Sequence, residues 1–274
     1  MPKKLALDKE SIKRRRLILE VLEKSRRGHV GSALSIVEIL RVLYENILQI
    51  NPKNPRDVNR DRFILSKGHG CIALYVELAI RGFFPNEALS KFCAFDGILG
   101  GHPEVATTPG VEASTGSLGH GLPIGVGLAV AAKIDKKTYR TYVLLGDGEC
   151  EEGTVWEAAL LASKHKLDNL TVLVDYNKMQ CYASTKDVCD LEPFAAKWTS
   201  FGFAVKEVDG HDIVALRKIL SKVPFSKKKP SLLICHTTKG KGISAIEQNT
   251  AWHHKAKVSD DEMAKLRRSL EESL

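Results

Sequence analysis

The residues best suited to chemistry follow two apolar segments near the middle of the chain. Asp147 lies in a Gly-Asp-Gly triplet that directly follows residues 141–145, and Asn177 directly follows residues 171–176. A carboxylate and an amide carbonyl are hard oxygen ligands, which suit Mg²⁺ or its substitute Ca²⁺ and serve zinc poorly. Because one carboxylate does not neutralise a divalent cation, we expect phosphate oxygens to complete the site. Gly148 would let backbone N–H groups approach that phosphate at a helix start.

Parallel strands are needed to bring these two residues together. Residues 141–145 and 171–176 have the composition of buried strands, and residues 151–165 between them have the pattern of a helix. Such a unit places its two strands parallel, with a right-handed crossover. Asp147 and Asn177 therefore leave the sheet at its carboxyl edge, where ligands of open α/β sheets bind.

Strand-like and helix-like segments alternate along the rest of the chain. Further strands are expected at residues 63–66, 203–210 and 231–238, and further helices at residues 8–25, 35–48, 71–82 and 213–223. The glycine-rich residues 116–127 are expected to run into a buried helix that continues through residue 132, and a short C-terminal helix starts at the capping-box pair Ser259 and Glu262. Short connections and the absence of a repeat or linker predict one domain over residues 1–274. We expect a three-layer α/β/α sandwich with a mainly parallel sheet.

The composition is that of a globular enzyme. Hydrophobic residues make up 43% and charged residues 27% of the 274, and no apolar run approaches a membrane span. The basic N-terminal segment lacks the apolar core of a secretory signal. The six cysteines form no C-x-x-C pair, so we expect buried, reduced thiols and a cytoplasmic location.

The net charge of +8 needs no nucleic acid to explain it. Basic clusters at residues 13–16 and 227–229 are expected to be solvated faces, and aromatic residues, at 7%, are not interleaved with them as nucleic-acid binding would require. A positive field would attract phosphorylated sugars.

Four histidines are candidates for proton transfer. His29, His69, His102 and His253 are each expected in a loop at a strand or helix end. Loops presented by a rigid sheet are where catalytic groups concentrate, and imidazole can both accept and return a proton near neutral pH.

Six motifs in order extend this picture across residues 14–257. They are RGHVGSALSIVEIL, ILSKGHGCIALY, GGHPE, STGSLGHGLPIGVGLA, the block that begins GDGECEEG and ends at Asn177, and HTTKGKGISAIEQNTAWHHK. Together they resemble the transketolase branch of the thiamine-diphosphate enzymes. The resemblance implies reversible transfer of a two-carbon ketol unit from a ketose phosphate to an aldose phosphate, with thiamine diphosphate and Mg²⁺.

The resemblance also implies a role for each matching position. The four histidines match substrate-channel histidines, although His254 is one register step from His253 and stays open as its alternative. The implied metal ligands are Asp147, Asn177 and the backbone carbonyl of Met179. The positions implied to bind the cofactor are His69, Gly116, Leu118, Gly148, Glu152, Asn177 and His253.

Other matches are less definite. Glu152 is implied to reach towards the partner's acid across a dimer interface, although a glutamate at a helix N-terminus is also expected from the helix dipole alone. His165, His211 and His236 match no family position, so we expect no part for them in the site.

The family also needs a glutamate from a pyrimidine-binding domain, which is not found in this sequence. Only a short helix is expected after His254. The chain therefore resembles the N-terminal, diphosphate-binding subunit of a split transketolase. The resemblance implies self-association through this domain, a partner chain that carries the pyrimidine domain, and a two-plus-two heterotetramer that is active only when assembled.

Three alternatives stay open at this point. A split enzyme of the same kind could use an unusual ketose that is branched, sulfonated or biosynthetic, because most sugar-phosphate anchors would lie on the partner. The alpha subunit of a 2-oxo-acid dehydrogenase would share the Gly-Asp-Gly and asparagine signature but lack the four histidines. A non-catalytic interaction subunit is disfavoured by the retention of Asp147 and Asn177.

Overall fold

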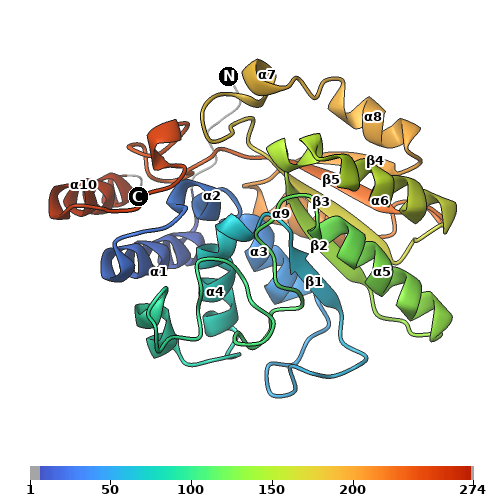
Figure 1. Cartoon of the computed structure of the whole chain (residues 1–274), viewed down its shortest axis with the longest axis horizontal. Helices are drawn as coiled ribbons and strands as arrows, with labels where there is room; N and C mark the ends of the chain where they lie inside the picture. The colour runs from blue at the N-terminus through green and yellow to red at the C-terminus, as the bar shows by residue number, and fades with distance from the viewer. Residues whose placement is uncertain (1–6, 273–274) are drawn as a thin grey trace.

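A parallel sheet of five strands forms the centre of the protein in the computed structural model, which describes residues 7–272 (Figure 1). The strands are β1 (Arg62–Leu65), β2 (Thr141–Gly146), β3 (Leu170–Tyr176), β4 (Ala204–Asp209) and β5 (Ser231–His236). They lie in the order β1-β2-β3-β5-β4, and every neighbouring pair is parallel. All five coincide with strands expected from the sequence, and the predicted fold class is confirmed.

The central strands are apolar throughout because both faces of the sheet are covered. Every residue of β2 and β3 is buried. Alternate side chains point to opposite layers, so Leu144 and Leu173 join one core cluster while Val143 and Val172 join the other. The edge strand β4 is only partly buried, which explains its lysine and glutamate residues.

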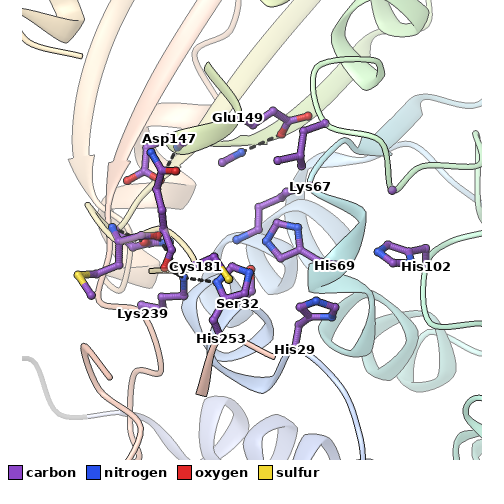
Figure 2. Close-up of a pocket in the computed structure, with 17 residues that line it drawn as sticks. His29, Ser32, Lys67, His69, His102, Asp147, Glu149, Cys181, Lys239 and His253 are labelled. Carbon is purple, nitrogen blue, oxygen red and sulfur yellow. Dashed lines mark hydrogen bonds between the residues drawn. The ribbon is translucent and has the colours of Figure 1, made fainter. Parts of the chain in front are cut away.

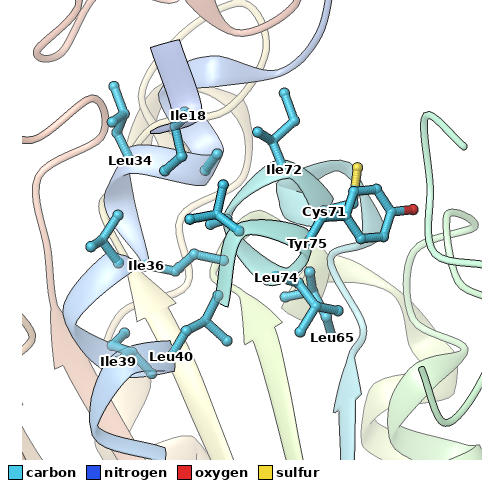
Figure 3. Close-up of a cluster of buried hydrophobic side chains, with 14 of the residues drawn as sticks. Ile18, Leu34, Ile36, Ile39, Leu40, Leu65, Cys71, Ile72, Leu74 and Tyr75 are labelled. Atoms are coloured by element: carbon cyan, nitrogen blue, oxygen red, sulfur yellow. The ribbon is translucent and has the colours of Figure 1, made fainter. Parts of the chain in front are cut away.

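Helices cover each face of the sheet. One layer contains α1 (Lys9–Ser25), α2 (Val30–Ser35), α3 (Val37–Val42), α4 (Cys71–Ile80), α9 (Ile213–Leu220) and α10 (Asp260–Glu271). The other contains α5 (Gly121–Ile134), α6 (Gly153–Lys164) and α8 (Phe194–Ser200). Figure 3 shows the packing of α2, α3 and α4 around side chains such as Leu34, Ile36 and Leu74.

Short helical turns complete the chain. They are the π-helical η1 (Leu43–Ile47), the 3-10 turns η2 (Gly68–Gly70), η3 (Asn86–Lys91), η4 (Gly148–Glu151) and η5 (Thr250–Trp252), and the short α7 (Thr185–Val188). The capping box of Ser259 and Glu262 opens α10 as expected. Within the described residues, no helix combines the length and the apolar character needed to cross a bilayer.

The helix expected at residues 35–48 is the main correction to the predicted elements. It begins earlier, at Val30, and consists of α2, α3 and η1, with a break at Ile36, where φ is −111°. Every residue of α2 is buried, so this segment lacks the polar face whose period identifies a helix in a sequence.

Two expectations about surface chemistry were also wrong. Half of the basic cluster at residues 13–16 is buried, because Arg14 pairs with Glu77 and Arg15 with Glu38. Long-range partners of this kind are not visible in the local sequence. Of the six cysteines, all reduced, half are buried (Cys71, Cys150 and Cys235) and half are exposed (Cys93, Cys181 and Cys189).

Candidate active site

A cavity of about 280 Å³ opens at the carboxyl edge of the sheet, where β1, β2, β3 and β5 end (Figure 2). Figure 2 shows the imidazoles of the predicted histidines on one side of the cavity and Asp147 on the other. The residues that line it are His29, Ser32, Lys67, His69, His102, Gly116, Leu118, Gly146, Asp147, Gly148, Glu149, Asn177, Met179, Gln180, Cys181, Lys239 and His253.

The sheet register brings Asp147 and Asn177 together as predicted. Gly146 pairs with Asp175, and the Asp147 N–H donates to the Asp175 carbonyl at 3.2 Å. The Asp147 carboxylate accepts hydrogen bonds from the N–H groups of Gly148 and Lys178. Asp147 thus lies at the end of β2 beside the segment that follows β3.

The amide of Asn177 has a defined orientation. Its Nδ2 donates to Asp175 Oδ2 at 2.9 Å, and its Oδ1 accepts from the Met179 N–H at 3.0 Å. Asp175 therefore fixes which end of the amide is the acceptor. One lone pair of Oδ1 is left for a further partner.

The carboxylate of Asp147 is buried, and no cationic side chain in the described part of the chain forms an ion pair with it. It is 3% exposed, and burial together with the neighbouring charge of Asp175 raises its pKa to about 7. A divalent cation would relieve this cost, because a metal ligand must be deprotonated. The donor set of Asp147, Asn177 and the Met179 carbonyl consists of hard oxygens and fits Mg²⁺.

Of the three predicted metal ligands, only Asp147 has an ionisable side chain; the other two are an amide and a backbone carbonyl. Within residues 7–272, no group of three or more His, Cys, Asp or Glu side chains is arranged to hold a metal. The predicted site has a single carboxylate, so it would still depend on phosphate oxygens. The Met179 carbonyl accepts a hydrogen bond from Lys239 Nζ at 3.1 Å, which shows that this oxygen faces the cavity.

The structure gathers all four predicted histidines. His29 caps α2, and its ring lies 5.5 Å from that of His69, 6.0 Å from that of His102 and 5.7 Å from that of His253. His69 lies in the turn between β1 and α4. His253 lines the cavity, with Nδ1 2.7 Å from Lys239 Nζ. His254 is exposed, with its ring centroid 4.5 Å from that of His29. The position in the cavity lining therefore belongs to His253.

The loop of His102 is held by α4. Tyr75 Oη donates to the carbonyls of Gly100 and His102, at 3.0 and 2.8 Å. The backbone at Gly116 passes against the His102 ring with φ of +155°, and a Cβ there would lie 3.1 Å from the ring. Glycine is required at this position for both reasons.

The imidazoles are neutral near neutral pH. Burial, together with nearby cationic and imidazole groups, lowers the pKa of His29 to about 4 and that of His253 to about 3. Burial and Lys67 hold the pKa of His69 well below its usual range, and burial lowers that of His102. Neutral imidazoles are ready to accept a proton. Because His253 Nδ1 accepts from the Lys239 ammonium, its proton lies on Nε2.

Two buried lysines were missed by the sequence analysis. Lys67 is 1% and Lys239 3% exposed. Lys67 Nζ donates to Asp175, whereas Lys239 Nζ contacts only neutral acceptors, and burial with Lys67 nearby lowers its pKa to about 8. Both follow the ends of predicted strands, as Asp147 does, and that placement was the available signal. Together they make this side of the cavity attractive to an anion.

Glu149 was also missed. This carboxylate is 2% exposed and accepts hydrogen bonds from Ser66 Oγ, from the Gly119 N–H at 2.9 Å and from the Gly146 N–H at 3.0 Å. It therefore connects the end of β1, the end of β2 and the loop that contains Leu118. Its place beside Gly148 gave no sign of this role.

Glu152 is the one predicted site residue outside the cavity lining. It is exposed at the N-cap of α6 and makes no capping hydrogen bond. Its position, on the outer side of the loop at Gly119, is compatible with the predicted contact to a partner, which stays a prediction.

Comparison with known proteins identifies this arrangement. Residues 7–272 match the family model described as "Transketolase, thiamine diphosphate binding domain". The chain belongs to this family. Transketolase-family relatives include one of the subunits of the apulose-4-phosphate transketolase of Phocaeicola vulgatus, 44% identical over 248 residues that cover 90% of this chain and 88% of the relative.

Two further similarities bear on the architecture. The 6-deoxy-6-sulfo-D-fructose transketolase subunit SqwG of a Clostridium species is 41% identical over 88% of this chain and 87% of its own length. The solved transketolase of Campylobacter jejuni superposes with a TM-score of 0.87 at 32% identity and covers 96% of this chain. This chain spans only 42% of that transketolase.

The residues present fit the family's cofactor. Thiamine diphosphate carries an anionic diphosphate, and the cavity offers the ammonium groups of Lys67 and Lys239 together with the hard oxygens of Asp147 and Asn177, which could hold a cation. The neutral imidazoles lie next to these lysines, with His253 Nδ1 2.7 Å from Lys239 Nζ, and they could hold a sugar.

Proposed function

We propose that this chain is the diphosphate-binding subunit of a two-chain transketolase. It would transfer a two-carbon ketol unit between phosphorylated or similarly anionic sugars, with thiamine diphosphate and Mg²⁺. The observation that supports this most directly is the cavity in which Asp147 and Asn177 lie opposite His29, His69, His102 and His253.

The residues divide the work by chemistry. Asp147, Asn177 and the Met179 carbonyl would hold the metal, while His69, Gly116, Leu118, Gly148 and His253 would contact the cofactor. When bound, thiamine diphosphate would supply a nucleophilic carbon for ketol transfer. A neutral imidazole would take the hydroxyl proton of the sugar whose loss allows the neighbouring C–C bond to break, and it would return that proton to the acceptor product.

The partner and the substrate follow from the relatives as proposals. Relatives of nearly the same length are named as single subunits of larger transketolases, which supports a second chain with the pyrimidine domain. Their names include apulose 4-phosphate and 6-deoxy-6-sulfo-D-fructose, and human transketolase is less similar, at 37% identity. We therefore propose that the donor is either a common ketose phosphate or an unusual ketose of the kind named for these relatives.

Reconstitution tests the proposal. The purified chain should transfer no two-carbon unit by itself and should gain activity when mixed with a partner chain that carries the pyrimidine domain, in the presence of Mg²⁺ and thiamine diphosphate. Steady-state assays would compare xylulose 5-phosphate, apulose 4-phosphate and 6-deoxy-6-sulfofructose as donors. Full activity of the single chain would contradict the two-chain proposal, and inactivity of the assembled pair on every ketose would contradict the reaction.

A further inference from the structure

The loop after β5 places a lysine ammonium in the cavity, and within residues 7–272 no carboxylate pairs with it. Lys239 is 3% exposed, and its Nζ lies 3.1 Å from the carbonyls of Met179 and Gln180 and 2.7 Å from His253 Nδ1. These three hydrogen-bond partners are neutral. The location of this charge must therefore depend on how the backbone of the loop is fixed.

The backbone is fixed on both sides of Lys239. On the N-terminal side, the Thr238 N–H donates to His211 Nε2 at 2.9 Å. On the C-terminal side, Arg15 Nε donates to the Lys241 carbonyl at 2.7 Å. His211 lies in the turn between β4 and α9, and Arg15 lies in α1, so two distant elements hold one short loop.

A buried carboxylate links the two anchors. Glu38, in α3, accepts hydrogen bonds from Arg15 at 2.6 and 3.0 Å and is 2.8 Å from His211 Nδ1. The side chains of Arg15, Glu38 and His211 are 0%, 1% and 6% exposed. Burial alone would raise the pKa of Glu38. The Arg15 charge and the hydrogen bonds of His211 and Arg15 outweigh this effect and lower the pKa below its usual value, so the carboxylate stays ionised.

The hydrogen bonds define which tautomer His211 adopts. Because Nε2 accepts the Thr238 N–H, it carries no proton, so the proton lies on Nδ1 and is donated to Glu38. Only a neutral group with one donor and one acceptor at these two places can make both bonds. A merely space-filling side chain would leave the Thr238 N–H and one Glu38 oxygen without this partner.

We propose that His211 is a positioning residue, which, with Glu38 and Arg15, holds the loop of residues 238–241 so that the Lys239 ammonium faces the anion-binding side of the cavity. His211 touches neither substrate nor cofactor and acts only through the loop. The inference rests on the proposed function only for the identity of the anion, a diphosphate. The sequence had given His211 no part in the site, and the long-range contact to Glu38 is what changes this.

Three substitutions separate positioning from packing. His211→Leu removes both hydrogen bonds and keeps an apolar side chain of similar size. His211→Gln is neutral and offers one acceptor and one donor, so it can restore both bonds. His236→Ala is the matched control, because His236 lies nearby at the end of β5 but pairs with Glu207 on the surface, where both side chains are more than 40% exposed.

The first readout is the loop itself in the full-length chain. Hydrogen–deuterium exchange followed by peptide mass spectrometry measures how well the amides of residues 238–241 are protected. We expect the same protection in the wild type, His211→Gln and His236→Ala. In His211→Leu the Thr238 N–H loses its acceptor, so exchange in this segment should become about tenfold faster or more.

Binding of inorganic pyrophosphate supplies a second measurement. Calorimetric titration should show affinity about tenfold weaker for His211→Leu than for wild type, with His211→Gln close to wild type. If His211→Leu does not fold, as judged by circular dichroism, His211→Asn replaces it, because its shorter side chain cannot reach both partners. Unchanged amide exchange of residues 238–241 in a folded Leu or Asn variant overturns the proposal, as does a Gln variant that changes as far as Leu.

These outcomes are distinct from failure of the proposed function. Amide exchange and pyrophosphate binding require neither the partner nor a sugar. A chain that never transfers a ketol unit but shows the faster exchange of residues 238–241 in His211→Leu would refute the transketolase proposal and support the positioning role. Normal transfer by His211→Leu with unchanged exchange would refute only the positioning role.

Discussion

Burial sets the chemistry of individual residues in the cavity. The four histidines lie close together beside Lys67 and Lys239, so a proton on any of them would add a positive charge to a cationic, poorly hydrated region. Their pKa values are therefore depressed, and they are neutral when the reaction needs a proton acceptor. Asp147 shows the converse: burial beside Asp175 raises its pKa, so a bound cation would stabilise the ionised carboxylate.

The histidine roles can be tested by two substitutions. Replacing His69 or His102 with Ala should lower kcat/KM of the assembled enzyme by on the order of 100-fold or more, the usual scale for a proton-transfer group. Metal affinity should barely change, since Mg²⁺ is held by oxygens. His165→Ala is a suitable control because His165 is exposed at the end of α6, whereas His211 is buried and unsuitable. Near-normal turnover of both variants would refute the channel assignment.

The metal assignment depends on Asp147. Asp147→Ala should weaken Mg²⁺-dependent binding of thiamine diphosphate by more than about 100-fold, because loss of a direct ligand exceeds the effect of losing an outer partner. The fold should persist, because the substitution removes a buried carboxylate that is unfavourable for folding when no cation is bound. Calorimetry on the assembled complex measures this, with the exposed Asp135→Ala as control. Equal affinity of the two variants would remove the metal site.

At the scale of elements, the site depends on how strand ends are tied to loops. β1, β2, β3 and β5 end at one edge, but parallel strands alone do not fix the loops that follow them. Glu149 supplies part of that connection by accepting from Ser66, Gly119 and Gly146. A buried carboxylate with three donors is expensive to remove because each donor then lacks a partner.

Glu149→Ala should therefore destabilise the chain more than a surface change does. We expect the free energy of unfolding to fall by about 2–4 kcal/mol, since each unpaired buried N–H costs about 1–3 kcal/mol and water can enter part of the gap. Urea denaturation followed by circular dichroism measures it. Glu157→Ala, on the exposed side of α6, should change stability by less than about 0.5 kcal/mol. A similar loss in both variants would rule out the connecting role.

At the scale of the whole molecule, exposed apolar side chains lie on α5 and α6. Leu160 is 59%, Leu161 45% and Ile124 39% exposed. These two helices pack against each other on one face of the sheet, and Glu152 is also exposed at the start of α6 (Figure 1). We predict that self-association, if it follows the resemblance, uses these side chains.

A charge introduced here should disrupt assembly. Leu160→Glu should shift the assembled enzyme from the mass of a two-plus-two complex towards smaller species, measured by sedimentation velocity, because burying an unpaired carboxylate in an interface is unfavourable. Val214→Glu is a matched control: Val214 is 64% exposed on α9, which covers the opposite face of the sheet. Unchanged mass for Leu160→Glu would place the self-association elsewhere.

The sequence alone determined the sheet and the residues at its edge. Buried parallel strands are apolar throughout, so residues 141–145 and 171–176 were identifiable, and their predicted parallel pairing placed Asp147 and Asn177 side by side. Six ordered motifs located the four histidines. Fully buried α2 was missed because a helix without a polar face carries no period.

Only the tertiary structure decided which charges meet. Lys67 and Asp175 are 108 residues apart, and His211 and Glu38 are 173 apart, so neither pairing leaves a local pattern. The same holds for Arg15 with Glu38 and for Glu149 with Ser66 and Gly119, which come from other elements. Local sequence reports backbone preference and burial, whereas the partner of a buried charge is fixed by how whole helices and strands pack, and that packing determines where the cavity's cations lie.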